Sequence, residues 1–212
     1  MIAVDWVAVS AIITAGATLV LAFATFASVR SANRAARAAE RSLLAGLRPL
    51  LAPSRLDDPP QKVGFSDEKW FVVPGGGAIA EVTETVVYLA IAVRNVGSGI
   101  AVLHGWRIVL DVTQGLLEHP PVDSFRRLTR DLYIAPTEAG FWQGAFRDPS
   151  EPEFADVSGA VEAPRRLGID ILYGDHELGQ RSITRFLLNP REDGKWIASV
   201  GRHWNVDRPD PR

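Results

Sequence analysis

The sequence contains no cysteine. Disulfide-stapled scaffolds, thiolate zinc sites and cysteine nucleophiles are therefore excluded as function classes. The absence also fits a reducing compartment, where structural disulfides are rare.

The chain lacks a complete nucleotide-binding motif as well. Residues 97–102 begin like a dinucleotide-binding turn, but Val102 takes the place of the third glycine, which lets helix and strand approach. The glycines at 75–77 lack the lysine and the serine or threonine of a phosphate loop. No Gly-x-Ser-x-Gly elbow is present either. We expect no cofactor and interpret both glycine-rich segments as turns.

Metal-ligand spacing is missing too. The histidines are widely separated and never form the pair of a helical metal site, since they stand at His104, His119, His176 and His203. Residues 175–177 place three possible ligands in one turn, but neighbouring side chains in a hairpin turn usually point apart. The acidic residues at 148–156 lack the register of a calcium loop. We therefore expect no metal site and no catalytic group recognisable from spacing.

Charge is absent from residues 6–29, where a helix would span roughly 36 Å, more than the hydrocarbon thickness of about 30 Å. Trp6 and Arg30 stand at its two ends, as is typical of a transmembrane segment. We expect residues 1–29 to form a single-pass anchor. The alternatives are a buried globular helix and a cleaved secretory signal, for which Ala22 and Ala24 supply a small-residue pattern but the N-terminal flank lacks lysine and arginine.

The orientation of the anchor follows from the uneven charge of its flanks. The net charge is only -2, yet residues 30–55 hold six arginines against Glu40, and Asp5 is the one charged side chain before them. The positive-inside rule then predicts an N-terminus outside the cell membrane and a cytoplasmic C-terminal domain. The rest of the chain is acidic overall, which argues against nucleic acid as a partner.

One face of the predicted anchor is small and weakly polar. Its residues recur at spacings of three and four, at Ala11, Thr14, Ala15, Thr18, Ala22 and Thr25. Such a stripe permits close helix contact in lipid, and its hydroxyls can bond across the contact or back to their own backbone. We expect this face to pack against a partner helix or a second copy. The alternative is that alanine and threonine are simply tolerated there.

A basic helical extension is expected at residues 30–47. Its arginines lie on one helix face at steps of four, three and four, at Arg30, Arg34, Arg37 and Arg41. Gly46 is placed to end this helix and Pro49 to prevent its resumption. The face can contact anionic lipid headgroups. Alternatively, its positive charge only sets the orientation of the anchor in the membrane. No aromatic residues interleave with the arginines, so nucleic-acid binding is not expected here.

Beyond residue 49 the apolar pattern changes from helical to alternating, which is typical of half-buried strands. Residues 86–94 and 100–112, with turn residues between them, predict a β-hairpin. Residues 167–173 and 181–188 predict a second strand pair. Shorter strands are expected at residues 49–54, 69–73, 140–146 and 196–200.

An antiparallel β-sandwich of immunoglobulin-like type is the architecture that these strands favour, because they follow one another without strong helices between them. An open barrel is the alternative. We assign residues 48–203 to this domain and 204–212 to an extended tail. One short helix is expected at residues 123–130, whereas the proline-containing residues 59–67 and 148–164 are expected to be loops.

Aromatic residues in the C-terminal half suggest a contact surface, because indole combines a large apolar area with one hydrogen-bond donor. The candidate residues are Trp142, Arg202, His203 and Trp204. The alternative is that residues 204–212 pack along the domain.

The expected function is that of a membrane-tethered, non-enzymatic interaction module, such as an accessory subunit of a membrane complex. A membrane-bound enzyme is the first alternative, with a site that converges only in three dimensions. Its first candidates are Asp170, Asp175, His176 and His203. A small-ligand sensor with an apolar pocket between the sheets is the second alternative.

Overall fold

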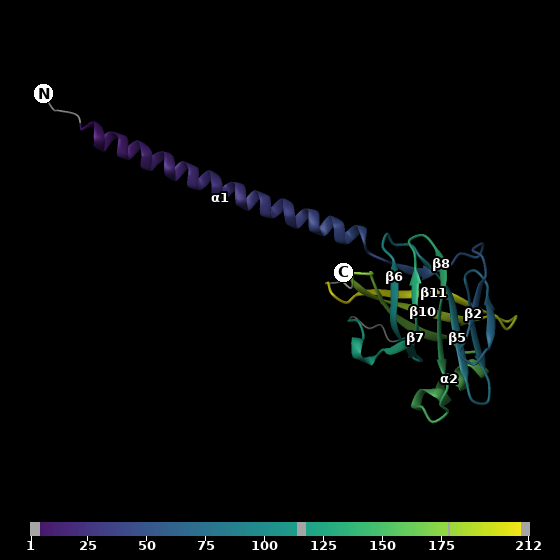
Figure 1. Ribbon diagram of the computed structural model, residues 1–212. Coiled ribbons are helices and arrows are strands. Elements are labelled where there is room, and N and C mark those ends of the chain that lie inside the picture. The colour runs from purple at the N-terminus through teal and green to yellow at the C-terminus, as the bar shows by residue number, and fades with distance from the viewer. Residues whose placement is uncertain (1–4, 114–117, 178, 209–212) are drawn as a thin grey trace. The chain divides into compact units, whose positions relative to one another are not determined.

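The computed structural model describes residues 5–113, 118–177 and 179–208. The chain divides into two compact units, Met1–Ala45 and Gly46–Arg212. The first unit is helical and the second is built mainly from strands (Figure 1). The predicted change from a long apolar helix to a β-rich domain is confirmed.

A single helix, α1 (Trp6–Gly46), makes up the first unit. Its stretch Val9–Leu44 is long and apolar enough to cross a membrane, and its most apolar window has a mean hydropathy of 2.0. The helix runs without interruption past Arg30 and ends at Gly46, as a glycine followed closely by Pro49 predicts.

Nine strands form the main sheet of the second unit, and every pairing between them is antiparallel. They are β1 (Leu51–Pro53), β4 (Gly77–Val82), β5 (Val87–Asn95), β6 (Ala101–Val109), β7 (Arg126–Ile134), β8 (Ala139–Phe146), β9 (Leu167–Gly174), β10 (Arg181–Pro190) and β11 (Trp196–Asn205). Their order is β1-β5-β4-β11-β10-β9-β6-β7, and β8 pairs with β5. The predicted pairing of the strands near residues 167 and 181 is confirmed.

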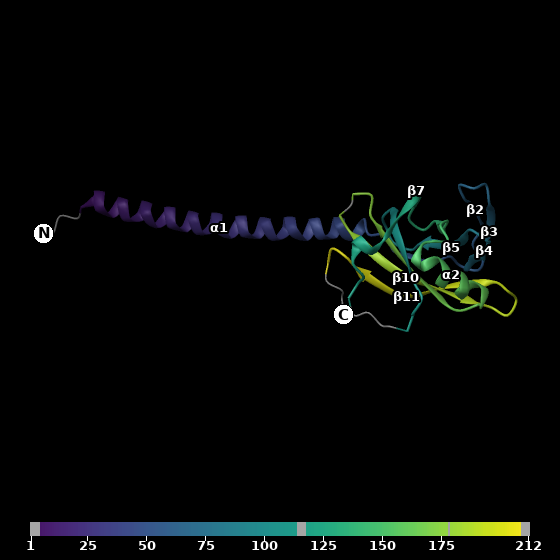
Figure 2. The same ribbon diagram turned by 90° about the horizontal axis from the view of Figure 1, so that it is seen from below.

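The sheet curls into a half-barrel around one core. Helix α2 (Pro152–Glu162) contributes Phe154, Val157 and Ala160 to that core. Strands β2 (Gln61–Gly64) and β3 (Trp70–Val73) form a separate hairpin, whose apolar residues pack against the outer face of β5. Figure 2 shows this hairpin at the β5 side of the domain. Strand β5 is therefore buried on both faces.

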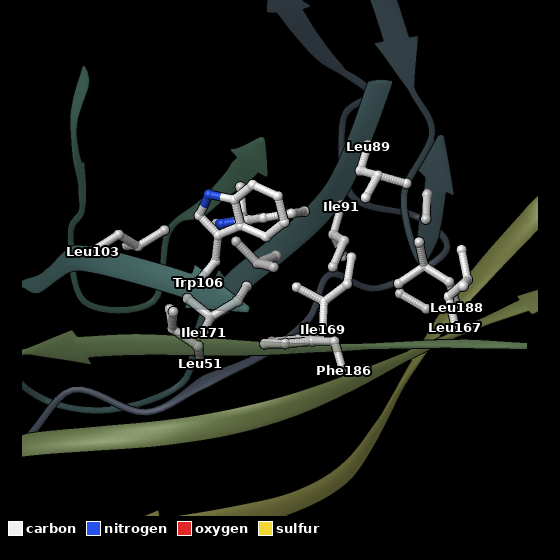
Figure 3. Close-up of a cluster of buried hydrophobic side chains, with 14 of the residues drawn as sticks. Leu51, Leu89, Ile91, Leu103, Trp106, Leu167, Ile169, Ile171, Phe186 and Leu188 are labelled. Carbon is white, nitrogen blue, oxygen red and sulfur yellow. The ribbon is translucent and has the colours of Figure 1, made fainter. Parts of the chain in front are cut away.

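The core is filled by side chains that point inward from β5, β6, β9 and β10 (Figure 3). Ile91, Ile169 and Phe186 are fully buried there. The indole of Trp106 meets that of Trp142 edge to face, with ring centroids 5.3 Å apart. Each of these large side chains contributes about 1.5–3 kcal/mol by leaving water, which makes this cluster the main source of domain stability.

Two expectations about topology need correction. The half-barrel does not confirm an immunoglobulin-like sandwich, and the strands near residues 86 and 100 do not form a hairpin. Strand β5 pairs with β1, β4 and β8, whereas β6 pairs with β7 and β9. The segment between β5 and β6 is therefore a crossing to another part of the sheet.

The side chain of Asn95 shows why the segment after β5 crosses over. Its Oδ1 accepts hydrogen bonds from the backbone N–H groups of Leu50 (3.2 Å) and Gly97 (3.0 Å), and its Nδ2 donates to the carbonyl of Ile134 (3.0 Å). A Cβ at Gly99 would lie 1.7 Å from the carbonyl oxygen of Leu47. The chain that enters the domain just before β1 thus runs directly over this segment, and only glycine fits at position 99.

Local expectations also changed in three places. The helix expected at residues 123–130 is a single 3-10 turn, η1 (Val122–Ser124), followed by β7, because Leu128 and Leu132 alternate toward the core. The two expected loops contain β2 and α2, the latter started by Pro152. Strand β11 runs to Asn205, so residue 204 belongs to the sheet.

Candidate functional site

Apolar side chains of α1 are exposed along its whole membrane-length stretch, including Ile12, Leu19 and Phe23. A helix on the surface of a soluble protein normally carries polar residues on one side. Residues 6–29 carry no charge on any side. Each large apolar side chain gains about 1.5–3 kcal/mol when it leaves water, and the helix is long and apolar enough to cross a membrane.

The threonine hydroxyls on the small-residue face of α1 form hydrogen bonds within the helix itself. Thr14 donates to the carbonyl of Ser10 (2.9 Å), Thr18 to that of Thr14 (2.8 Å) and Thr25 to that of Leu21 (2.8 Å). Bonding back to the helix backbone is the second of the two arrangements expected from sequence. Any contact on this face, which also includes Ala11, Ala15 and Ala22, would therefore rest on close packing.

The arginines of α1 begin where its apolar stretch ends. Arg30, Arg34 and Arg37 border one hollow of the helix surface together with Phe26. Arg41 lies further along the same helix, and its side chain is outside the described part of the chain. Guanidinium groups on the same side as an apolar ring can reach lipid headgroups while the ring remains in hydrocarbon.

The proposed contact surface on the β domain needs correction, because Trp142 and Trp204 are 0% and 1% exposed. Trp142 lies in the main core on β8, and Trp204 packs with Leu172 and Ile183 on the outer face of the sheet. Trp204 is covered by the guanidinium of Arg202, 5.3 Å from the ring centroid. The indoles therefore hold the domain together and do not form one exposed surface.

His203 also has an internal role. Its Nδ1 lies 2.6 Å from the hydroxyl of Thr184, which is 2.9 Å from the hydroxyl of Tyr173. The Tyr173 oxygen in turn accepts a hydrogen bond from the backbone N–H of Leu51 (3.2 Å). Burial raises the pKa of Tyr173, so the hydroxyl keeps its proton. This chain of contacts ties β1, β9, β10 and β11 together.

The residues considered for an enzyme site are not brought together. Asp170 is fully buried and binds the guanidinium of Arg185 through two contacts of 2.6 and 2.8 Å. It lies on the opposite face of the sheet from His203, since their partners Arg185 and Thr184 alternate along β10. Asp170 and His203 therefore cannot share one catalytic centre.

The other two candidates lie in the turn between β9 and β10. Asp175 accepts a hydrogen bond from the backbone of Gly179 (2.8 Å), and His176 lies 3.3 Å from Glu177 on the surface. Within residues 5–113, 118–177 and 179–208, no cluster of histidine, aspartate and glutamate side chains could hold a metal ion.

An exposed apolar surface lies elsewhere, on the β2–β3 hairpin and beside it. Trp70 and Val72 are 60% and 63% exposed, and Leu56 is exposed as well. Leu56 and Val72 border a groove of about 610 Å³ that reaches Trp196. We name Leu56, Trp70 and Val72 the hairpin patch. The sequence carried a signal for it, because four apolar residues in a row at 70–73 place apolar side chains on both faces of a strand.

Comparison with protein-family models, with curated proteins and with solved structures found no match to this chain.

Proposed function

We propose that this chain is a membrane-tethered, non-enzymatic interaction module, an accessory subunit that presents its β domain on the cytoplasmic side. The observation that carries the proposal is the charge-free stretch of α1, whose apolar side chains are exposed on every side. Such a helix is stable in lipid and costly in water. The domain attached to it would then work at the membrane surface.

Its orientation is proposed from the arginines that follow the apolar stretch. Arg30, Arg34 and Arg37 are exposed on the helix, and each contributes about 1 kcal/mol near an anionic leaflet. The N-terminal flank offers only Asp5. The cytoplasmic leaflet of a membrane is the anionic one, so the arginines favour a cytoplasmic domain and an external N-terminus.

The absence of cysteine allows a direct test of orientation with single-cysteine variants. Ser66 is exposed, so a Ser66→Cys thiol would be accessible on the folded domain. We expect a membrane-impermeant maleimide to label Ala3→Cys in intact cells and Ser66→Cys only after lysis. Labelling of Ser66→Cys without lysis would reverse the proposed orientation.

The hairpin patch supports the second half of the proposal, that the domain contacts a protein. Exposed apolar surface shared by neighbouring side chains often marks an interaction site on a soluble domain. Trp70 and Val72 are exposed two residues apart on β3, and the exposed Leu56 borders the same groove as Val72. Tryptophan at such a position is also the residue type most often found to dominate binding energy.

The test is affinity purification of the full-length chain from native membranes in mild detergent, with the mass of the complex measured. We expect a stoichiometric second membrane protein that is lost from a Trp70→Ala, Val72→Ser variant. Tyr133→Ala is the matched control, because Tyr133 is 63% exposed on another strand. Recovery of only a monomer or a homo-oligomer would contradict the role of accessory subunit.

The small-residue face of α1 provides an independent arm of the same experiment. A Thr18→Leu, Ala22→Leu variant adds bulk to that face, whereas Val20→Leu adds bulk elsewhere on the helix. We expect the first variant to weaken the complex and the second to leave it unchanged. A complex that survives both variants would mean that the contact does not involve this face.

A further inference from the structure

Strands β7 and β8 follow each other in the chain but do not pair. Strand β7 pairs with β6, and β8 pairs with β5, so each strand keeps one edge without a sheet partner among the described residues. Every second residue of such an edge directs its backbone N–H and C=O away from the sheet. We name the space between these two edges the seam.

A cavity of about 170 Å³ lies in the seam. Its polar lining consists of Arg126, Arg127, Thr129, Gln143 and Arg147, and one indole, that of Trp106, lines it as well. No carboxylate is among the lining residues, although the domain as a whole is acidic. The cavity is smaller than the roughly 300 Å³ at which pockets for drug-sized ligands begin, so it suits a small ion.

Gln143 is the unusual residue of this cavity. It is only 6% exposed, and its Oε1 is buried without a hydrogen-bond partner in the described part of the chain. Buried acceptors of this kind are rare in native proteins, because the group loses its water and gains nothing in return. An acceptor in this state favours a ligand that brings an O–H or N–H group.

The arginines of the seam differ in how far they are already neutralised. Arg126 binds the carboxylates of Glu151 and Glu153 and lies over the ring of Phe146, 4.5 Å from its centroid. Arg147 is held more loosely, 3.7 Å from Asp67.

Arg127 is exposed, and its guanidinium forms no hydrogen bond or ion pair with any residue that the structure describes. Its full positive charge therefore remains available to a ligand. Arginine suits an oxyanion in particular, because its planar group of donors matches the spacing of two oxygens.

We propose that the seam binds a small oxyanion that also carries a proton to donate, hydrogen phosphate being the simplest member of this class. Arg127 and Arg147 bind the charged oxygens, Thr129 adds a hydroxyl, and Gln143 accepts the hydrogen bond from the protonated oxygen. Sulfate has the same shape and charge as hydrogen phosphate but no proton, so it would place an oxygen lone pair against the Gln143 acceptor.

The test uses the full-length chain in nanodiscs of phosphatidylcholine, so that no phosphate monoester lipid is present. Binding of inorganic phosphate and of sulfate is measured by calorimetry at constant ionic strength and about pH 8, where both are dianions. We expect phosphate to bind about tenfold more tightly than sulfate, because one hydrogen bond to a charged ligand is gained. Equal binding of the two anions would overturn the proposal.

Two variants separate the parts of the site. Gln143→Leu is expected to remove the preference for phosphate over sulfate, and Arg127→Gln to weaken both anions about tenfold. Arg191→Gln, an exposed arginine in the turn between β10 and β11, is the matched control and is expected to change neither. An Arg127→Gln variant that binds like the unchanged chain, or equal losses in Arg191→Gln, would also overturn the proposal. Arg127 is exposed, so this variant tests the site even if Gln143→Leu does not fold.

Discussion

The two units of this chain differ in whether their apolar side chains are exposed or buried. Helix α1 exposes its apolar side chains on all sides, whereas the β domain alternates them and buries those of β5, β9 and β10 around one core. The domain is therefore stabilised by the apolar side chains that it encloses, whereas the helix leaves its own apolar side chains for an environment outside the chain to cover. The comparison shows that the spacing of apolar residues, more than their number, indicates the environment of each unit.

The two units also differ in where they place charged side chains. Residues 6–29 contain no charged side chain, so insertion of this helix into lipid would carry no cost of removing side-chain charge from water. The domain accepts that cost at Asp170, which is fully buried and neutralised by Arg185, with Arg107 3.7 Å away. One unit excludes charge and the other pairs it.

The largest effect is expected from charge placed in the apolar helix. A Leu19→Arg, Phe23→Arg variant introduces two cations near the middle of the uncharged stretch, each costing about 3 kcal/mol of insertion free energy. We expect the chain to lose its resistance to alkaline carbonate extraction. Ser31→Arg, placed among the natural arginines, is the control and should be retained in membranes. Retention of the double variant would mean that α1 is not held by lipid.

Removal of one member of the buried ion pair should affect only the domain. Asp170→Asn leaves Arg185 buried without its counter-charge, which costs about 3–5 kcal/mol of unfolding free energy. Urea unfolding followed by tryptophan fluorescence measures this loss, and the membrane-bound fraction should not change. Asp131→Asn, at an exposed aspartate of β7, should be neutral within about 0.5 kcal/mol. A small effect at Asp170 would indicate that water reaches the pair.

Features that depend on neighbouring residues could be predicted from sequence. The absence of charge at residues 6–29 indicates the apolar helix, and Gly46 with Pro49 marks its end. The alternation at residues 167–188 predicts both members of the β9–β10 pair, because a short polar turn joins them. In each case the residues that predict the feature are close in sequence to the residues that form it.

Features that depend on distant partners could not be predicted. The crossing after β5 is fixed by hydrogen bonds from Asn95 to Leu50 and Ile134, far away in sequence. The seam follows from that crossing, because it sends β6 and its partner β7 to the far end of the sheet.

Trp204 illustrates the same limit for a single side chain. Strict alternation along β11 would place Trp204 on the same core face as Trp196. The pairing of β10 with β11 shifts between Arg185 and Phe186, however, and this shift places Trp204 on the outer face. The residue skipped by the register is Gly201, and a glycine inside a strand is compatible with a bulge but does not by itself predict one.

A smaller effect is expected from adding a methyl group at two glycines of the domain that differ in the space around them. A Cβ at Gly144 would lie 2.8 Å from the buried ring of Trp142 and 2.9 Å from that of Trp106, so Gly144→Ala should destabilise the domain by about 1–3 kcal/mol. A Cβ at Gly159, in α2, would meet nothing within 4 Å. Gly159→Ala should therefore stabilise the domain by up to about 1 kcal/mol, because alanine favours the helix. Urea midpoints of the two variants that shift in the same direction would contradict this packing.

The smallest effect concerns pH and a single histidine of the domain. Burial, with a further contribution from the charge of Arg181, lowers the pKa of His104, and its Nε2 is buried without a hydrogen-bond partner among the described residues. The unfolded chain then binds a proton near pH 6.5, before the folded chain does, so stability must fall as pH decreases through that value. We expect the urea midpoint to be lower at about pH 5 than at about pH 8, and His104→Gln to reduce this difference. His176→Gln, at a surface histidine, should preserve it; if His176→Gln abolishes the difference instead, the pH response belongs to the β9–β10 turn and not to the buried ring.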